Sequence, residues 1–222
     1  MISQVTYVRD PVSFHSEGRA GFRDKDIWYA PLMAPNKIVV DQVRVILQTK
    51  MWLETVVVGF GFCPFASREM EHGRVRYSVI PSGEVFACLQ SLLGECRLLD
   101  ENSSIETALL VFPCGFDDFK DFLALLDLAE KLLVDQAYGG TYQLASFHPL
   151  YCFANSTEED AANYTNRSPY PMLHLLREDS VAKALATFSN PETIPGRNIE
   201  FARAFGKENM KAMLAACYAL EK

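Results

Sequence analysis

RVRYSVIPSGEVFACLQSLLGECRLLDENSSIETALLVFP, residues 74–113, decides the class of fold. It begins with RVRYSVIP, where apolar residues alternate along the chain as they do in a β-strand. Pro81, Ser82 and Gly83 interrupt this pattern, and EVFACLQSLLGECRLLD then reads as a helix. ETALLVFP is a short continuous apolar run, which is typical of a strand buried on both faces. A strand, a helix and a second strand in this order predict a crossover unit.

The alternation of helices and strands continues on both sides of this stretch. Residues 39–57 repeat apolar positions at helical spacing, and residues 117–136 do so in one broad stripe that Asp117 can cap. TYQLASFHP, residues 141–149, predicts a third strand. We therefore expect an α/β fold with a small, mostly parallel sheet and helical crossovers. Periodicity leaves one alternative open, an α+β ferredoxin-like two-layer sandwich.

Helices are also predicted towards the C-terminus. Residues 168–188 are expected to be helical, because Ser168 can cap a helix and Pro169 suits its first position. A last helix is expected to begin at Asn198 and to contain a kink at Gly206.

Composition and charge indicate a globular chain. Of the 222 residues, 49% are hydrophobic and 22% are charged, which provides ample core material. Residues 1–37 are polar and lack a sustained period, so we expect an irregular N-terminal arm, followed by a single α/β domain over residues 38–222. A net charge of −7 argues against a nucleic-acid partner, which would require a basic face.

No feature of the sequence predicts a membrane or secreted protein. The most apolar window, MWLETVVVGFGFCPFA, contains Glu54 and is too short for a membrane span. The first residues lack the basic start and apolar stretch of a signal peptide. None of the six cysteines forms a C-x-x-C pair, and we expect them to be reduced thiols in the cytoplasm.

Two candidate catalytic residues lie next to structural breaks. His148 ends the third predicted strand and is followed by Pro149 and Tyr151, and ligands gather at such strand ends in open sheets. It is predicted to be an acid–base residue, or else a histidine that only hydrogen-bonds its loop. Cys63, in GFGFCPFA, is predicted to be a nucleophile or metal ligand, or else a small buried apolar residue.

The stretch from Asn163 to the predicted helix at Ser168 forms a candidate binding site. Asn163, Asn166 and Ser168 precede a predicted helix N-terminus, whose amide N–H groups attract anions. Arg167 adds a planar donor for a carboxylate or phosphate, and Tyr151 is placed in the same substrate site. The alternative is a cap network in which Arg167 pairs with an acidic residue at 159 or 160.

The sequence identifies no cofactor. It contains no P-loop, no dinucleotide-binding G-x-G-x-x-G after a strand, no H-E-x-x-H and no G-x-S-x-G. His174 and Glu178 are four residues apart within the predicted helix, which is a weak signal for a pair of metal ligands.

Three segments resemble a known family. WLETVVVGFGFCPFA, ASFHPLYCFAN and NYTNRSPYPMLHLLRED are together similar to the bacterial-type domain-of-unknown-function family 1415, over roughly residues 40–190. Members commonly have an asparagine two places before the cysteine, where this chain has Gly61. The resemblance implies a cytosolic protein and carries no activity.

Three functional hypotheses follow. The first is a cytosolic small-molecule enzyme with an anion-binding pocket, in which His148 moves a proton, Cys63 is a nucleophile and Arg167 holds the ligand. The second is a metal-binding protein with Cys63, His148 and His174 as ligands. The third is a non-catalytic binding or interaction module. The sequence does not choose between them, and the partner is predicted only to be an anionic or polar small molecule.

Overall fold

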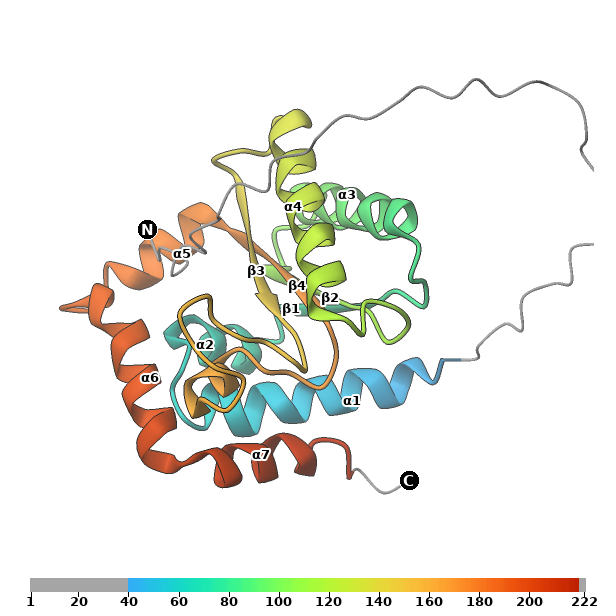
Figure 1. Ribbon diagram of the computed structural model, residues 1–222. Coiled ribbons are helices and arrows are strands. Elements are labelled where there is room, and N and C mark those ends of the chain that lie inside the picture. The colour runs from blue at the N-terminus through green and yellow to red at the C-terminus, as the bar shows by residue number, and fades with distance from the viewer. Residues whose placement is uncertain (1–39, 220–222) are drawn as a thin grey trace, which may run out of the picture.

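The computed structural model describes residues 40–219, and its centre is a four-stranded sheet (Figure 1). The strands lie in the order β1 (Val75–Val79), β2 (Thr107–Val111), β4 (Met172–Arg177) and β3 (Tyr142–Phe147). The three strands predicted from the sequence are β1, β2 and β3, and all three are confirmed. The predicted arm, residues 1–37, lies outside the described residues, and the single domain over residues 38–222 stays a prediction.

The predicted crossover unit is present. β1 and β2 pair in parallel from Val75↔Thr107 to Val79↔Val111, and helix α3 (Val85–Glu101) connects them. β2 is buried at every position, as its continuous apolar run predicts. Helix α4 (Phe119–Asp135) follows, capped by Asp118, whose Oδ1 accepts a hydrogen bond of 2.7 Å from the amide of Lys120. The predicted cap, Asp117, is therefore wrong by one residue.

The segment predicted as a helix over residues 168–188 begins instead with a strand. β4 pairs antiparallel with β2 on one side and with β3 on the other. A strand in this central position needs apolar residues on both faces, so its sequence shows no alternation. Helix α5 (Glu178–Leu185) begins only where β4 ends.

The sheet is consequently mixed. β1, β2 and β3 run in one direction, and β4 runs against them between β2 and β3. The α/β class is confirmed, whereas the expectation of a mostly parallel sheet holds for strand direction and not for strand pairing, since two of the three pairs are antiparallel.

Helices cover both faces of the sheet (Figure 1). α3 and α4 pack on the face that carries Ala108 and Leu110. Residues of α1 (Gln42–Trp52), α6 (Ile194–Phe205) and α7 (Lys207–Ala216) join the core on the face that carries Leu109 and Val111. This three-layer arrangement differs from the ferredoxin-like alternative, which has two layers.

A π-helical turn leads from α1 towards the short helix α2 (Pro64–Glu71). This turn, η1 (Leu53–Val58), continues α1 directly, and the amide of Gly59 donates to the carbonyl of Glu54 five residues earlier, at 3.0 Å. Gly206, with φ of 91°, separates α6 from α7, where the sequence predicts a kink. Within residues 40–219, no helix combines the length and apolar character needed to cross a bilayer.

Candidate functional site

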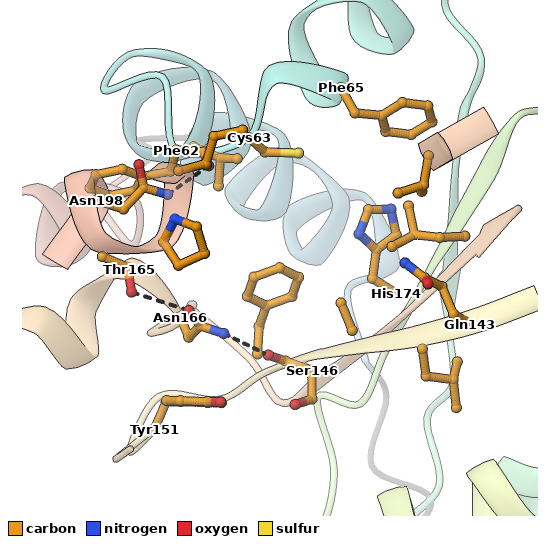
Figure 2. A pocket seen from close by; sticks show the side chains of 18 of the residues that line it. Phe62, Cys63, Phe65, Gln143, Ser146, Tyr151, Thr165, Asn166, His174 and Asn198 are labelled. Carbon is orange, nitrogen blue, oxygen red and sulfur yellow. Dashed lines mark hydrogen bonds between the residues drawn. The ribbon is translucent and has the colours of Figure 1, made fainter. Parts of the chain in front are cut away.

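A cavity of about 290 Å³ lies beside the edge strand β3 (Figure 2). Its walls come from η1 and the turn before α2, from α4, from β3 and β4, from the loop that joins these two strands, and from the N-terminal parts of α5 and α6. Segments far apart in the chain therefore meet around one hollow. Apolar side chains make up most of the wall, among them Val57, Phe62, Phe65, Phe147, Val181 and Ile199.

Glycines shape the turn that brings Cys63 to this wall. A Cβ atom on Gly59 would lie 2.3 Å from the carbonyl oxygen of Thr55, so a larger residue cannot end the π-helical turn without a shift. Gly61 has φ of 66°, a conformation that favours glycine. From the opposite side, Arg197 donates to the carbonyl of Gly61, and Asn198 Nδ2 donates to that of Phe62 at 2.8 Å. These contacts fix α6 against the turn.

Cys63 is the N-cap residue of α2, and Figure 2 shows its thiol pointing into the cavity. Burial raises the pKa of this thiol, and the amide N–H groups of Phe65 and Ala66 at the sulfur oppose the rise only partly. The resting side chain is therefore a neutral thiol near neutral pH.

His174 lines the cavity from β4, opposite Ala145 of β3 (Figure 2). Its Nε2 lies 2.7 Å from the hydroxyl oxygen of Thr107 on β2. Burial lowers the pKa of His174 to about 4, so the imidazole is neutral at physiological pH.

None of the described residues that line the cavity carries a formal charge. The polar wall residues are Cys63 and His174 together with neutral amides and hydroxyls, such as Gln143, Asn166 and Asn198. This chemistry differs from the anion-binding cup that the sequence predicts around Arg167.

His148 does not line the cavity. It is fully buried, with Phe119 and Phe122 ring centroids 5.1 Å and 5.2 Å from its own. Its Nε2 donates to the carbonyl of Phe116 at 2.8 Å, and its Nδ1 accepts from the amide of Leu150 at 2.9 Å. Both ring nitrogens are therefore occupied by the backbone, which favours the alternative of a histidine that stabilises its loop.

Arg167 is also engaged by the backbone. Its Nε donates to the carbonyl of Tyr151 at 3.1 Å, its Nη2 donates to that of Glu158 at 2.9 Å, and the guanidinium lies 4.6 Å from the Tyr164 ring. The expected pairing with residue 159 or 160 is absent from residues 40–219, because Glu159 pairs with Lys207 and Asp160 with Arg203.

Asn163 and Ser168 are buried in the same loop. Asn163 Oδ1 accepts from the amide of Phe153 at 3.1 Å, and its Nδ2 donates to the carbonyl of Thr157 at 2.7 Å. Ser168 donates to the carbonyl of Tyr170 at 2.6 Å and caps no helix, because a strand follows it. The predicted helix N-terminus is therefore wrong, and the predicted anion site loses the helix amide N–H groups on which it was based.

Of the predicted site residues, Cys63, Tyr151 and Asn166 lie on the cavity wall, whereas His148, Asn163, Arg167 and Ser168 do not. Sequence reasoning missed Gln143 and Asn198, and it assigned His174 to a helix face. The signal for His174 is its single polar position within the apolar run MLHLL, which on a strand shares a face with Met172 and Leu176.

The metal alternative lacks a ligand set in the part of the chain that the structure describes. Residues 40–219 contain no group of three or more His, Cys, Asp or Glu side chains placed to hold a metal ion. Cys63 and His174 share the cavity, but His148 is not part of it.

Fold and cavity together define a three-layer α/β protein with an uncharged hollow beside its edge strand. A family model described as "Protein of unknown function (DUF1415)" matches residues 44–212, and the chain belongs to this family. The resemblance drawn from the three sequence segments is thereby confirmed. No curated protein and no solved structure shows significant similarity to the chain.

Proposed function

We propose that this protein binds a neutral, largely apolar small molecule in the cavity between α2, β3, β4 and α6. The observation that carries the proposal is the wall itself, which encloses about 290 Å³ and includes no charged side chain among the described residues. Small-molecule sites are concave and mostly apolar, with a few polar groups that orient the ligand. An ion that entered this cavity would lose its hydrating water and would find no charged side chain to replace it. A neutral ligand is therefore favoured over an anion.

Under this proposal, the residues named in the enzyme hypothesis have different roles. Tyr151, Asn166 and Cys63 remain ligand-facing, whereas His148 and Arg167 stabilise the loop that builds the wall. A second candidate function is covalent chemistry at Cys63, which the direction of its thiol into the cavity favours.

The cytoplasm remains the proposed compartment. All six cysteines of the chain lie within the described residues and are unpaired, which suits a reducing environment. Nucleic acid remains outside the proposed partners, because the net charge is −7.

The proposal is tested with a neutral fluorescent probe, N-phenyl-1-naphthylamine. We expect a saturable rise in its fluorescence with the full chain, and a weaker response from the anionic probe 1-anilinonaphthalene-8-sulfonate. Ala145→Phe places a ring in the cavity beside His174 and should reduce probe affinity at least about tenfold.

Ala212→Phe is the matched control, because residue 212 is exposed on α7 and does not line the cavity. It should bind the probe like the wild type. Thermal unfolding of each variant checks that it is folded. Non-saturable binding to the wild type, or equal affinities for both Phe variants, would contradict the proposal.

A further inference from the structure

We infer that the ligand carries a hydroxyl head group, which donates its hydrogen bond to Nδ1 of His174 and accepts one from Gln143. This inference rests on the proposed function, because it specifies the ligand of the same cavity.

The hydroxyl of Thr107 determines which nitrogen of His174 carries the hydrogen. Thr107 Oγ1 lies 2.6 Å from the carbonyl oxygen of Leu175 and 2.7 Å from Nε2 of His174. A carbonyl oxygen only accepts, and a hydroxyl has one hydrogen to give, so that hydrogen is committed to Leu175. Nε2 must then donate to Thr107, which assigns the Nε2–H tautomer from the hydrogen-bond network.

The other nitrogen is left as an acceptor. A neutral imidazole has one hydrogen, so Nδ1 carries a lone pair, and the lowered pKa of His174 keeps the ring neutral at physiological pH. No residue within 40–219 forms a hydrogen bond with Nδ1. Nδ1 is also not one of the buried side-chain atoms that lack a partner in this range, so part of its surface is exposed. Since His174 lines the cavity, Nδ1 is accessible from it.

Gln143 supplies the complementary group. Ala145 lies directly opposite His174 in the β3–β4 pair, so Gln143, two residues away on the same face, is a diagonal neighbour of His174. Both side chains line the cavity, and Figure 2 shows them at the same end of it. The amide of Gln143 can donate to the oxygen of a group whose hydrogen points at Nδ1.

The remaining polar amides of the wall are already engaged. Asn198 Nδ2 donates to the carbonyl of Phe62, and Asn166 bonds both Ser146 and Thr165. A head group that both donates and accepts therefore finds its partners at His174 and Gln143. A hydroxyl on an apolar body, as in a phenol or a fatty alcohol, has this chemistry without a charge.

Three naphthalenes of nearly equal size test the inference at pH 7: naphthalene, 2-methoxynaphthalene and 2-naphthol. Their affinities are measured by displacement of N-phenyl-1-naphthylamine from the full chain. We expect the wild type to bind 2-naphthol about fivefold to tenfold more tightly than either analogue without a donor. His174→Phe retains a ring but removes the acceptor, and should abolish this preference.

Thr107→Val is the second variant and leaves the histidine in place. It removes the group that fixes the tautomer, so the preference for 2-naphthol should decrease towards that of the His174→Phe protein. Nitrogen-15 NMR of histidine-labelled wild type reads the tautomer directly, without any variant. An Nδ1–H tautomer of His174 would overturn the inference.

The outcomes separate the two proposals. Equal, saturable binding of all three naphthalenes to the wild type would overturn the hydroxyl inference and leave the neutral cavity ligand standing. Failure of the wild type to bind any of them or the fluorescent probe would overturn both.

Discussion

At the scale of single residues, two histidines show how hydrogen-bond partners decide a role. His148 has both ring nitrogens bonded to backbone groups, whereas His174 has one nitrogen bonded to Thr107 and one facing the cavity. A strand end followed by proline makes His148 the more conspicuous residue in the sequence. The number of ring nitrogens left for a ligand depends on distant partners, which the sequence does not reveal.

The histidines predict a loss of stability in acid. Burial lowers the pKa of His174 from its ordinary value near 6.5 to about 4. Between pH 6.5 and about pH 4, His174 is therefore protonated in the unfolded chain and neutral in the folded protein, which favours unfolding. The contribution of His174 is therefore complete above pH 6.5 and decreases as the pH falls, by at most about 1.4 kcal/mol per pH unit.

Urea unfolding of the wild type and His174→Phe at several pH values between 7 and 4 measures this contribution. The variant should lose stability less steeply over that range. The pKa of His148 is also lowered by burial. Because both proteins contain His148, its contribution to the pH dependence of stability cancels in the comparison. Parallel pH profiles for the two proteins would show that His174 does not titrate in this way.

We predict that a ligand in the cavity protects the thiol of Cys63 from alkylation. Because burial raises its pKa, iodoacetamide at pH 8 should label Cys63 more slowly in the folded protein than in the unfolded chain. Saturating N-phenyl-1-naphthylamine should slow the labelling further. Cys114, which is half-buried but does not line the cavity, is the internal control in the same peptide map. Equal protection of both cysteines would place the probe elsewhere.

At the scale of elements, the strength of the local pattern decided what could be predicted. α4 has a broad apolar stripe and β2 has a continuous apolar run, and both are found where the sequence predicts them. The sequence predicts a helix where β4 lies, because Ser168 and Pro169 resemble a helix start. In the folded chain the carbonyl of Pro171 accepts from the amide of Phe112 at 3.0 Å, which begins the sheet pairing instead. That pairing is tertiary, so local propensity does not show it.

We predict that alanine has opposite effects on stability at two glycines in helical surroundings, Gly59 and Gly94. Gly59→Ala places a Cβ atom 2.3 Å from the Thr55 carbonyl oxygen and should destabilise the protein by about 2 kcal/mol. Gly94→Ala, in the middle of α3, places a Cβ atom that meets nothing within 4 Å beyond its chain neighbours and the backbone of its own helix, and it should stabilise the protein by about 0.5–1 kcal/mol. Chemical denaturation measures both changes, and destabilisation by both would indicate that helix propensity does not govern position 94.

At the scale of the whole molecule, the cavity arises where three distant parts of the chain meet without filling the space between them. Cys63, Gln143 and Asn198 come from such parts, and each also has a role in local structure. Cys63 is the N-cap residue of α2, Gln143 lies in β3, which pairs with β4, and Asn198 donates to the carbonyl of Phe62. Cys63 and Asn166 could be predicted as candidate site residues from their unusual motifs, and both lie on the cavity wall. The hollow could not, because it depends on the sizes of side chains that only the sheet order brings together.

The π-helical turn has a consequence for how this cavity tolerates change. A π-helical turn holds one residue more than the α-helical ladder around it, and each α-helical residue turns the chain by about 100°. Deleting any one residue between Leu53 and Val58 would restore ordinary helical pairing without breaking the helix. In an ordinary α-helix, a deletion would rotate everything after it by this angle. Because the π-helical turn holds the extra residue within itself, the chain after it, Cys63 included, should keep its place, and only side chains of the turn, such as Val57 in the cavity wall, should shift. The cavity should thus tolerate a shorter chain at this point better than a larger residue at Gly59.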